Sequence, residues 1–201
     1  MRQDRGRVSL KYKTVVIDPP WPIVTDGLAA IETGNYQTNP PDLNYNTVDE
    51  KWLMEFPLNE FAADKSLLFL WVTGGVTKSS YPIIKLGFDM LREWGFTYRA
   101  MLYWSKKNTG MSKPFLPFRC TVEPIMFASR GYSQIPPYGQ YSDIIHAPRR
   151  SHSEKPYEFY QLQRARTPEP RIDIFARNAH EGFDGWGDEY VGDGPLQEFL
   201  Q

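Results

Sequence analysis

The residues whose types and spacing best suit chemistry are Asp18, Pro19, Pro20 and Trp21. Residues 14–17 before them are apolar or β-branched, which is typical of a short buried strand. The two prolines lack an amide N–H and fix φ, so the strand must end there in a rigid turn. The turn combines a carboxylate, a carbonyl at Pro19 and a broad aromatic plane. Two acceptors suit an exocyclic amine, and the indole plane suits a stacked base.

An ordinary strand-ending turn followed by a core tryptophan would use the same four residues. A short motif is a hypothesis until its structural context agrees with it. On the tetrapeptide alone, both interpretations stand.

The composition excludes several other chemistries. The 23 Lys and Arg against 24 Asp and Glu give a net charge of −1, so no global basic signal points to nucleic acid, although basic residues can gather on one face. The single cysteine, Cys120, excludes an internal disulfide framework and a cysteine-based zinc site. His146, His152 and His180 lack metal-ligand spacing, so we expect no metal. Neither a Gly-x-Gly-x-x-Gly motif nor a phosphate loop is present, which argues against a dinucleotide oxidoreductase and a nucleoside triphosphatase.

The length of 201 residues fits a single domain over 1–201, with a core at about 10–191. Neither a secretory signal nor a membrane-spanning apolar run is present, so we expect a cytoplasmic protein with no membrane partner. Long loops are expected at 22–46, 108–118 and 131–141, with a frayed tail at 192–201. Such loops tend to carry binding function on a rigid scaffold.

Hydrophobic patterning predicts alternating strands and helices. Expected strands are 14–17, 67–72, 98–105, 123–129, 143–147 and 171–177, and expected helices are about 47–56, 78–94 and 154–166. Thr47 and Glu50 form a capping-box pattern, and Pro156 suits an early helical position. This alternation predicts an α/β fold, with a mostly parallel central sheet flanked by helices. Ligands of such sheets bind at the carboxyl ends of strands, where Asp18, Lys106 and Arg177 could converge.

Further motifs follow the first in a fixed order along the chain. They are Tyr45-Asn46-Thr47, Leu70-Trp71-Val72, Trp104-Ser105-Lys106, Arg119 with Glu123, Arg149 with His152-Ser153-Glu154-Lys155-Pro156, Phe175-Ala176-Arg177 and Trp186-Gly187-Asp188-Glu189. Together with the first motif, this ordered set resembles the adenine-N6 methyltransferases of the mRNA-methyltransferase type, including their bacterial and phage relatives that modify DNA. The resemblance covers about residues 12–190.

The resemblance implies a Rossmann-like methyltransferase fold that uses S-adenosylmethionine. By position, it implies cofactor contacts from Ile17, Asp18, Lys155, Phe175, Arg177, Asn178, Asp188 and Glu189. Family members often carry Asn-Gln where this chain has Asp188 and Glu189. A carboxylate can accept a hydrogen bond from a ribose hydroxyl as an amide does, but it cannot donate one. From periodicity alone, Phe175 could equally be a core residue.

The same resemblance gives the first motif a catalytic role shared by Asp18, Pro19, Pro20 and Trp21. The carboxylate of Asp18 and the carbonyl of Pro19 would each accept one hydrogen of the adenine amine and so localise its lone pair. Asp18 could then take the proton. Trp21 would stack on the base, which in a duplex must first be flipped out.

Basic and aromatic residues suggest how nucleic acid could be held. Besides Trp21, the candidate substrate contacts are Tyr45, Lys106, Arg119 and Arg149, and the basic ones could equally form a solvated face. The leading interpretation is methylation of adenine N6 in DNA. Its alternatives are the same reaction on RNA and a catalytically silent nucleic-acid-binding subunit. The expected partner is nucleic acid, with a homo- or hetero-oligomer left open.

Overall fold

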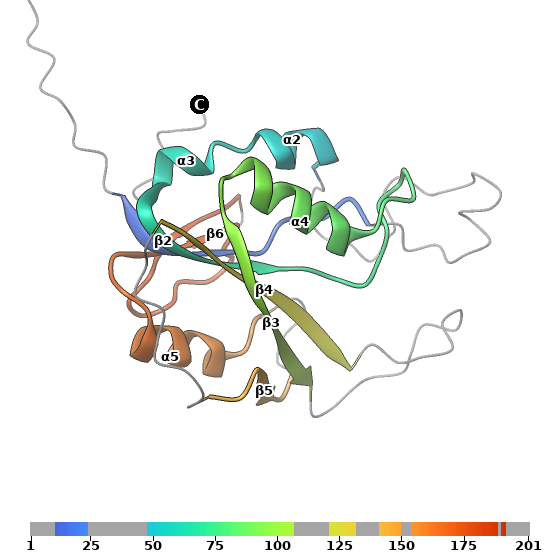
Figure 1. Ribbon diagram of the computed structural model, residues 1–201. Helices are drawn as coiled ribbons and strands as arrows, with labels where there is room; N and C mark the ends of the chain where they lie inside the picture. Colours follow the sequence, from blue (N-terminus) through green and yellow to red (C-terminus); the bar gives the residue numbers. More distant parts are fainter. Residues whose placement is uncertain are drawn as a thin grey trace, which may run out of the picture.

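The computed structural model describes residues 11–23, 48–106, 121–131, 141–149, 154–188 and 190–191. Seven strands of these residues form one sheet in the order β5-β3-β4-β2-β1-β6-β7 (Figure 1). The strands are β1 (Tyr12–Ile17), β2 (Ala62–Trp71), β3 (Thr97–Lys106), β4 (Val122–Arg130), β5 (Ile144–Ala147), β6 (Arg171–Ile174) and β7 (Asp184–Trp186). The helices are α2 (Glu50–Glu55), α3 (Leu58–Phe61), α4 (Ile83–Glu93) and α5 (Tyr157–Arg166).

The sheet is mostly parallel, which confirms the predicted α/β class. β1 pairs in parallel with both β2 and β6, β6 with β7, and β3 with β5. β4 is the exception because it runs antiparallel to both of its neighbours, β2 and β3. The first residues of β4 therefore lie at the same edge of the sheet as the last residues of β1, β2 and β3.

Helices cover both faces of the sheet, with α2, α3 and α4 on one side and α5 on the other (Figure 1). Alternation along the buried strands builds the two cores. Val15 and Ile17 of β1 belong to the cluster that contains the side chains of α2, α3 and α4. Val16 belongs to the second cluster, with Trp71 and with Phe159 of α5. Side chains at 14, 16 and 18 therefore point toward α5.

Three predicted boundaries were wrong in detail. The N-cap of α2 is Asp49, whose carboxylate accepts the amide hydrogen of Trp52 at 2.6 Å, and Thr47 lies outside the described residues. α5 begins at Tyr157, with Pro156 as its N-cap instead of its first turn. β6 stops at Ile174 because Phe175 adopts a positive φ of 64°, which no strand can continue. The sequence patterns also missed α3 and β7.

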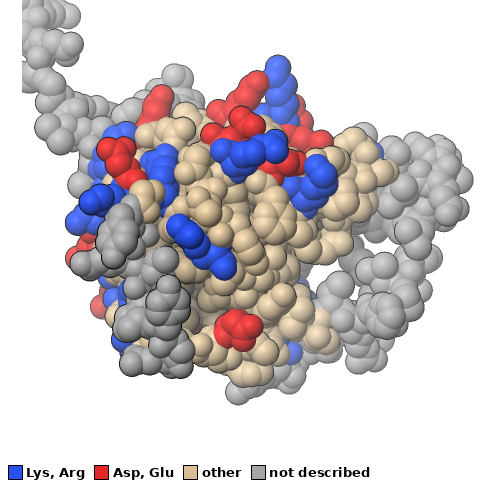
Figure 2. Space-filling view, in the orientation of Figure 1, with Lys and Arg blue, Asp and Glu red and all other residues tan. Residues whose placement is uncertain are grey.

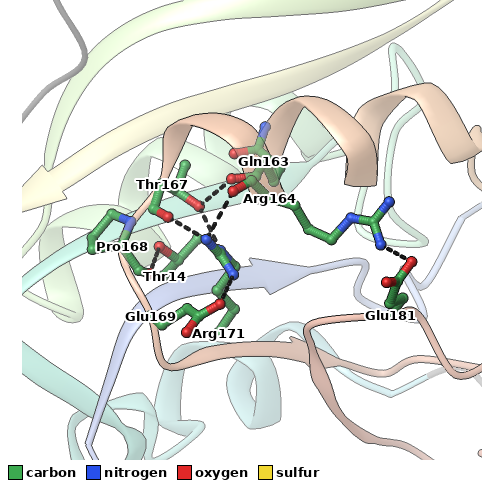
Figure 3. A network of polar contacts seen from close by, with 8 residues as sticks. All are labelled: Thr14, Gln163, Arg164, Thr167, Pro168, Glu169, Arg171 and Glu181. Carbon is green, nitrogen blue, oxygen red and sulfur yellow. Dashed lines mark hydrogen bonds and ion pairs between the residues drawn. The ribbon is translucent and has the colours of Figure 1, made fainter.

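The C-terminal end of α5 is fastened to β6 by the buried guanidinium of Arg171 (Figure 3). It donates to the backbone carbonyls of Thr167 at 2.6 Å and Arg164 at 3.0 Å, and to the carboxylate of Glu169 at 2.8 Å. The last carbonyls of a helix lack partners within it, so these bonds satisfy them with a favourable charge. The anchor fixes α5 over the sheet. The segment just before α5 lies at the carboxyl edge.

The surface carries both signs of charge. Figure 2 shows acidic and basic side chains interspersed above α2 and α4, while the middle of this face is largely uncharged. Among the described residues, no helix is long and apolar enough to cross a membrane. The same part of the chain has no cluster of three or more His, Cys, Asp or Glu arranged for a metal ion. The predicted loops fall almost entirely outside the described ranges.

Candidate active site

Four strand ends meet at the carboxyl edge of the sheet. Asp18 follows β1, Trp71 ends β2 and Lys106 ends β3. Glu123 lies at the start of β4, directly opposite Trp104 of β3. Because β4 runs backwards, its first residues join the last residues of its neighbours. The edge therefore carries two carboxylates and a lysine beside two indole rings.

Lys155 joins these groups from the segment just before α5. Its ammonium lies 3.1 Å from Oδ2 of Asp18 and 3.0 Å from Oε2 of Glu123. Oε1 of Glu123 binds the ammonium of Lys106 at 2.5 Å. The side chain of Lys155 is only 13% exposed, whereas that of Asp18 is 31% exposed. The four residues thus alternate in sign along the edge, and Asp18 is the acidic member that pairs with one lysine instead of two.

The electrostatics distinguish the two carboxylates. Burial raises the pKa of Asp18, and the repulsion from Glu123 adds to this, while the charge of Lys155 opposes it. Burial also acts to raise the pKa of Glu123, but the charges of Lys155 and Lys106 outweigh it and lower that pKa to about 2. The pKa of Lys155 is raised because its two carboxylates outweigh burial. Glu123 is therefore a permanent anion, and Asp18 is the better proton acceptor.

Two indole rings form the base of this ion network. The ammonium of Lys155 lies 4.5 Å from the centroid of the Trp71 ring, and that of Lys106 lies 5.1 Å from the Trp104 ring. The two rings meet edge to face at 6.2 Å. Nε1 of Trp104 donates to the carbonyl of Ala147 at 3.0 Å, which fixes its plane. A cation over an aromatic face is stabilised by the ring quadrupole, so both lysines are held against the sheet.

The turn after β1 is rigid, as the two prolines predict. The carbonyl of Pro19 accepts the amide hydrogen of Trp21 at 2.8 Å, and the carbonyl of Pro20 accepts that of Val48 at 3.3 Å. Trp21 is only 4% exposed, and its Nε1 donates to the carbonyl of Trp71 at 3.1 Å. The structure thus places the ring of Trp21 in the core, as in the second interpretation of the motif. Its stacking on a base stays a prediction that requires the ring to become exposed.

A second group of predicted residues lies where β6 and β7 end. Phe175 turns the chain with its positive φ, and its ring packs 5.4 Å from Phe56 and 5.5 Å from Trp186. It is therefore partly a core residue. Asn178 and Asp188 are exposed and Arg177 is half-buried. The charge of Arg177 acts to lower the pKa of Asp18, so the guanidinium lies within electrostatic reach of that carboxylate.

A buried polar cluster lies beneath this site. Asp173 of β6 is 3% exposed and accepts the hydroxyl hydrogen of Tyr160 at 2.7 Å. The ring of His180 stacks on that of Tyr160 at 3.5 Å, with Nε2 3.9 Å from the carboxylate of Asp173. Burial, with repulsion from Asp18, raises the pKa of Asp173 to about 7. Burial lowers the pKa of His180 to about 4.

The structure brings together some predicted residues and assigns others elsewhere. Of Asp18, Lys106 and Arg177, which were expected to converge, Asp18 and Lys106 lie in one ion network through Lys155 and Glu123. Lys106 is paired with Glu123 inside the network, and its predicted contact with a phosphate stays a prediction. The side chain of Ile17 is fully buried in the core, and Arg149 is exposed. Tyr45, Arg119 and Glu189 lie outside the described residues, so their predicted roles remain predictions.

Sequence reasoning had given no role to Glu123, Trp71 or Trp104. Glu123 and Trp71 enter the sequence analysis only as parts of family motifs, and Trp104 enters as part of such a motif and as a stacking residue beside Lys106. An available signal was the acidic Glu123 at the head of an otherwise apolar strand, because a buried carboxylate needs a partner. Tyr160 and Asp173 lie within predicted elements and gave no separate signal.

An α/β domain with an acidic turn after its first strand, and its polar groups gathered at the carboxyl edge, is consistent with a Rossmann-like methyltransferase. The family model described as MT-A70 matches residues 12–189, so this chain belongs to the MT-A70 family.

Curated relatives include two different classes of enzyme by name. The chain is 29% identical over 190 residues to "N6-methyladenosine RNA methyltransferase MTA1" of Pyricularia oryzae, which covers 90% of this chain and 47% of that protein. It is 28% identical over 195 residues to "Type II methyltransferase M.MunI" of Mycoplasma sp, covering 88% of this chain and 77% of that one. It is 29% identical over 180 residues to the human "N(6)-adenosine-methyltransferase catalytic subunit METTL3", covering 83% and 26%. The chain thus spans about half or less of two of these three relatives.

Proposed function

We propose that this chain transfers a methyl group from S-adenosylmethionine to the N6 amine of adenine in DNA. The observation that carries the proposal is the carboxylate of Asp18, held at the carboxyl edge by Lys155 at 3.1 Å, in a chain matched by the MT-A70 family over 12–189. Of the three relatives described above, the Type II methyltransferase is matched over the largest share of its length, which supports DNA over RNA.

The acceptor side of the reaction would be formed by the turn after β1. Asp18 would accept one hydrogen of the adenine amine. The carbonyl of Pro19 uses one lone pair for the amide of Trp21, and its second lone pair can accept the other amine hydrogen. Two acceptors on one amine localise the nitrogen lone pair, which in the free base is delocalised into the ring. A raised pKa also makes Asp18 a stronger base for the proton that the amine must lose.

The residues at the ends of β6 and β7 fit the methyl donor. S-adenosylmethionine, when bound, supplies an electrophilic methyl group. The exposed carboxylate of Asp188 suits its hydroxyl or amino groups, and the guanidinium of Arg177 suits its carboxylate. Lys155 has three N–H donors, of which Asp18 and Glu123 use two, so one can serve a ligand. With Phe175, Asn178 and Glu189, these residues form the proposed donor site.

The main contribution of the carboxyl edge to the reaction would be to hold the reacting groups in position. Lys155, which lies over the Trp71 ring, holds Asp18, and Arg171 holds α5 against β6. Groups that are already oriented need no reorganisation as the reaction proceeds. Both substrates would therefore meet a carboxylate whose position is set by the scaffold.

Transfer of labelled methyl from S-adenosylmethionine to matched DNA and RNA pools, with nucleoside analysis of the product, tests the proposal. N6-methyladenine in the DNA pool alone is the expected result. Label in RNA alone would replace DNA by RNA as the substrate. Cofactor binding without transfer to either pool would point to a missing partner subunit or a narrow target sequence. Loss of both transfer and cofactor binding would indicate the silent subunit. Light scattering of the same preparation gives the oligomeric state.

A further inference from the structure

Tyr190 folds back onto the last strand of the sheet and occupies the place of a missing side chain. β7 forms one edge of the sheet, and its central residue is Gly185. A Cβ atom added there would meet the ring of Tyr190, with Cε2 at 2.1 Å, Cζ at 2.3 Å and the hydroxyl oxygen at 2.7 Å. Those are the three nearest atoms. The hydroxyl edge of the ring therefore lies against the backbone of β7, where a side chain on residue 185 would clash with it.

The contact closes a tight turn. The amide of Tyr190 donates to the carbonyl of Gly187 at 3.1 Å, so this bond closes a reversal of the chain between Gly187 and Tyr190. Gly187 also has no room for a side chain, because a Cβ atom there would lie 2.4 Å from the carbonyl oxygen of Ala176. Asp188 follows Gly187 inside this reversal, where it is exposed. The Tyr190 ring thus fixes the far end of the turn that presents Asp188.

Backbone hydrogen bonds connect this turn to the end of β6. The amide of Ala176 donates to the carbonyl of Trp186 at 2.9 Å, just before the turn. The amide of Val191 donates to the carbonyl of Arg177 at 3.4 Å, just after it. These two bonds lie on either side of the turn that contains Asp188. They therefore hold that turn beside the backbone of Ala176 and Arg177. The Tyr190 ring on Gly185 braces these bonds from the edge of the sheet, as aromatic rings brace glycine in other edge strands.

We propose that Tyr190, seated on Gly185, is a positioning residue for the methyl donor: it holds the turn of Asp188 in the place that binds S-adenosylmethionine. This inference rests on the proposed function, because it assigns the donor to that turn. Tyr190 would not touch the reacting atoms. Its loss would loosen the turn and weaken donor binding while leaving Asp18, Lys155 and Glu123 in place.

Donor binding and the double-mutant cycle of Tyr190 and Gly185 test the inference. In Tyr190→Ala we expect the Kd and KM for S-adenosylmethionine to rise about 10-fold, with kcat at saturating donor within about twofold. Tyr190→Phe keeps the ring and should bind like the wild type. Val191→Ala is the matched control, since Val191 adjoins the turn but is 81% exposed. Gly185→Ala should weaken binding as Tyr190→Ala does, and should add little to it in the double variant.

Hydrogen exchange of the protein without donor supplies a second readout. The amide of Tyr190 should exchange about 10-fold faster in Tyr190→Ala, while amides of β1 and β2 should not change. Unchanged donor affinity in Tyr190→Ala, or additive effects in the double variant, would overturn the inference alone. Equal losses of kcat, donor affinity and Tm would also overturn it, because they describe a general folding defect. A wild-type protein that binds no S-adenosylmethionine would overturn the proposed function with it.

Discussion

Glu123 accepts a hydrogen bond from the ammonium of Lys155 at 3.0 Å, although the two residues are 32 positions apart, one in β4 and the other just before α5. This contact gives Lys155 a second carboxylate besides Asp18. The pair sets how strongly Lys155 can neutralise Asp18. The basicity of Asp18, the proposed catalytic carboxylate, therefore depends on the contact between Glu123 and Lys155.

Replacing Asp18 should remove the proposed base without removing the fold. Asp18→Ala deletes the acceptor for the amine hydrogen, and we expect kcat to fall about 10³-fold or more, in the range of a lost general base. Tm and the affinity for S-adenosylmethionine should change little, because Lys155 keeps Glu123 as a partner. Single-turnover transfer assays and calorimetric binding measure both quantities. Undiminished transfer by this variant would remove Asp18 from the mechanism.

Replacing Glu123 by glutamine should shift the pH dependence of the reaction. The charge of Glu123 raises the pKa of Asp18, so its removal lets Lys155 act on Asp18 alone and lowers that pKa. The acid limb of the kcat profile should move to lower pH, and the plateau should drop about 10-fold as Asp18 becomes a weaker base. Glu55→Gln, on the exposed surface, is the control. An unshifted acid limb would mean that Asp18 is not the titrating group.

Replacing Trp21 by phenylalanine separates its two proposed roles. The variant leaves the carbonyl of Trp71 without its indole partner, and we expect a loss of about 1–3 kcal/mol in the free energy of unfolding. Trp94→Phe is the matched control, since Trp94 is equally buried and its Nε1 has no hydrogen-bond partner among the described residues. Denaturant titration compares the two. If Trp21 also stacks on the base, KM for DNA should rise about 10-fold in Trp21→Phe; an unchanged KM would leave only the core role.

Replacing Asp173 should change how stability depends on pH. The raised pKa of Asp173, about 7, stabilises the fold at low pH, and this contribution is lost as the pH rises from about 4 to 7. His180, with its pKa lowered to about 4, acts oppositely, because its stabilising contribution grows from about pH 4 to 6.5. In the wild type, the opposite contributions of Asp173 and His180 to the pH dependence of stability largely cancel. In Asp173→Asn, the Tm should rise with pH across this window.

Thermal unfolding of Asp173→Asn at several pH values checks this prediction. The Tm difference between variant and wild type should become more positive from pH 4 to 7 and then level off. Asp143→Asn, on the surface, should run parallel to the wild type. A constant difference for Asp173→Asn would show that Asp173 keeps an ordinary pKa in the folded protein.

The alternating pattern of the sequence was sufficient for most of the fold. Residues 14–17 and 67–72 are predicted as buried strands, and they coincide with the C-terminal parts of β1 and β2, except that Val72 lies just past the end of β2. β7 was missed because three residues around a glycine carry no period. The end of β6 was missed because the pattern of 171–177 continues past Ile174, while the positive φ of Phe175 depends on its packing.

The candidate site could be predicted only where strands run parallel. The expectation that ligands bind at carboxyl ends found Asp18 and Arg177, each just past a strand. It gave no role to Glu123, because that residue begins its strand and reaches the same edge only through the reversal of β4. It also placed Lys106 at this edge, but it could not show that the ammonium of Lys106 pairs with the carboxylate of Glu123 there.

The late position of Lys155 in the chain has a consequence for folding. Asp18 and Glu123 belong to strands that β2 joins, so their carboxylates can approach one another as soon as residues 12–130 have paired. Until the segment before α5 docks, Lys106 is the nearby cation that these carboxylates have among the described contacts, and their repulsion favours a proton on one of them. Docking of Lys155 releases that proton. Docking of the segment before α5 should therefore become more favourable as the pH rises through the pKa of the undocked pair.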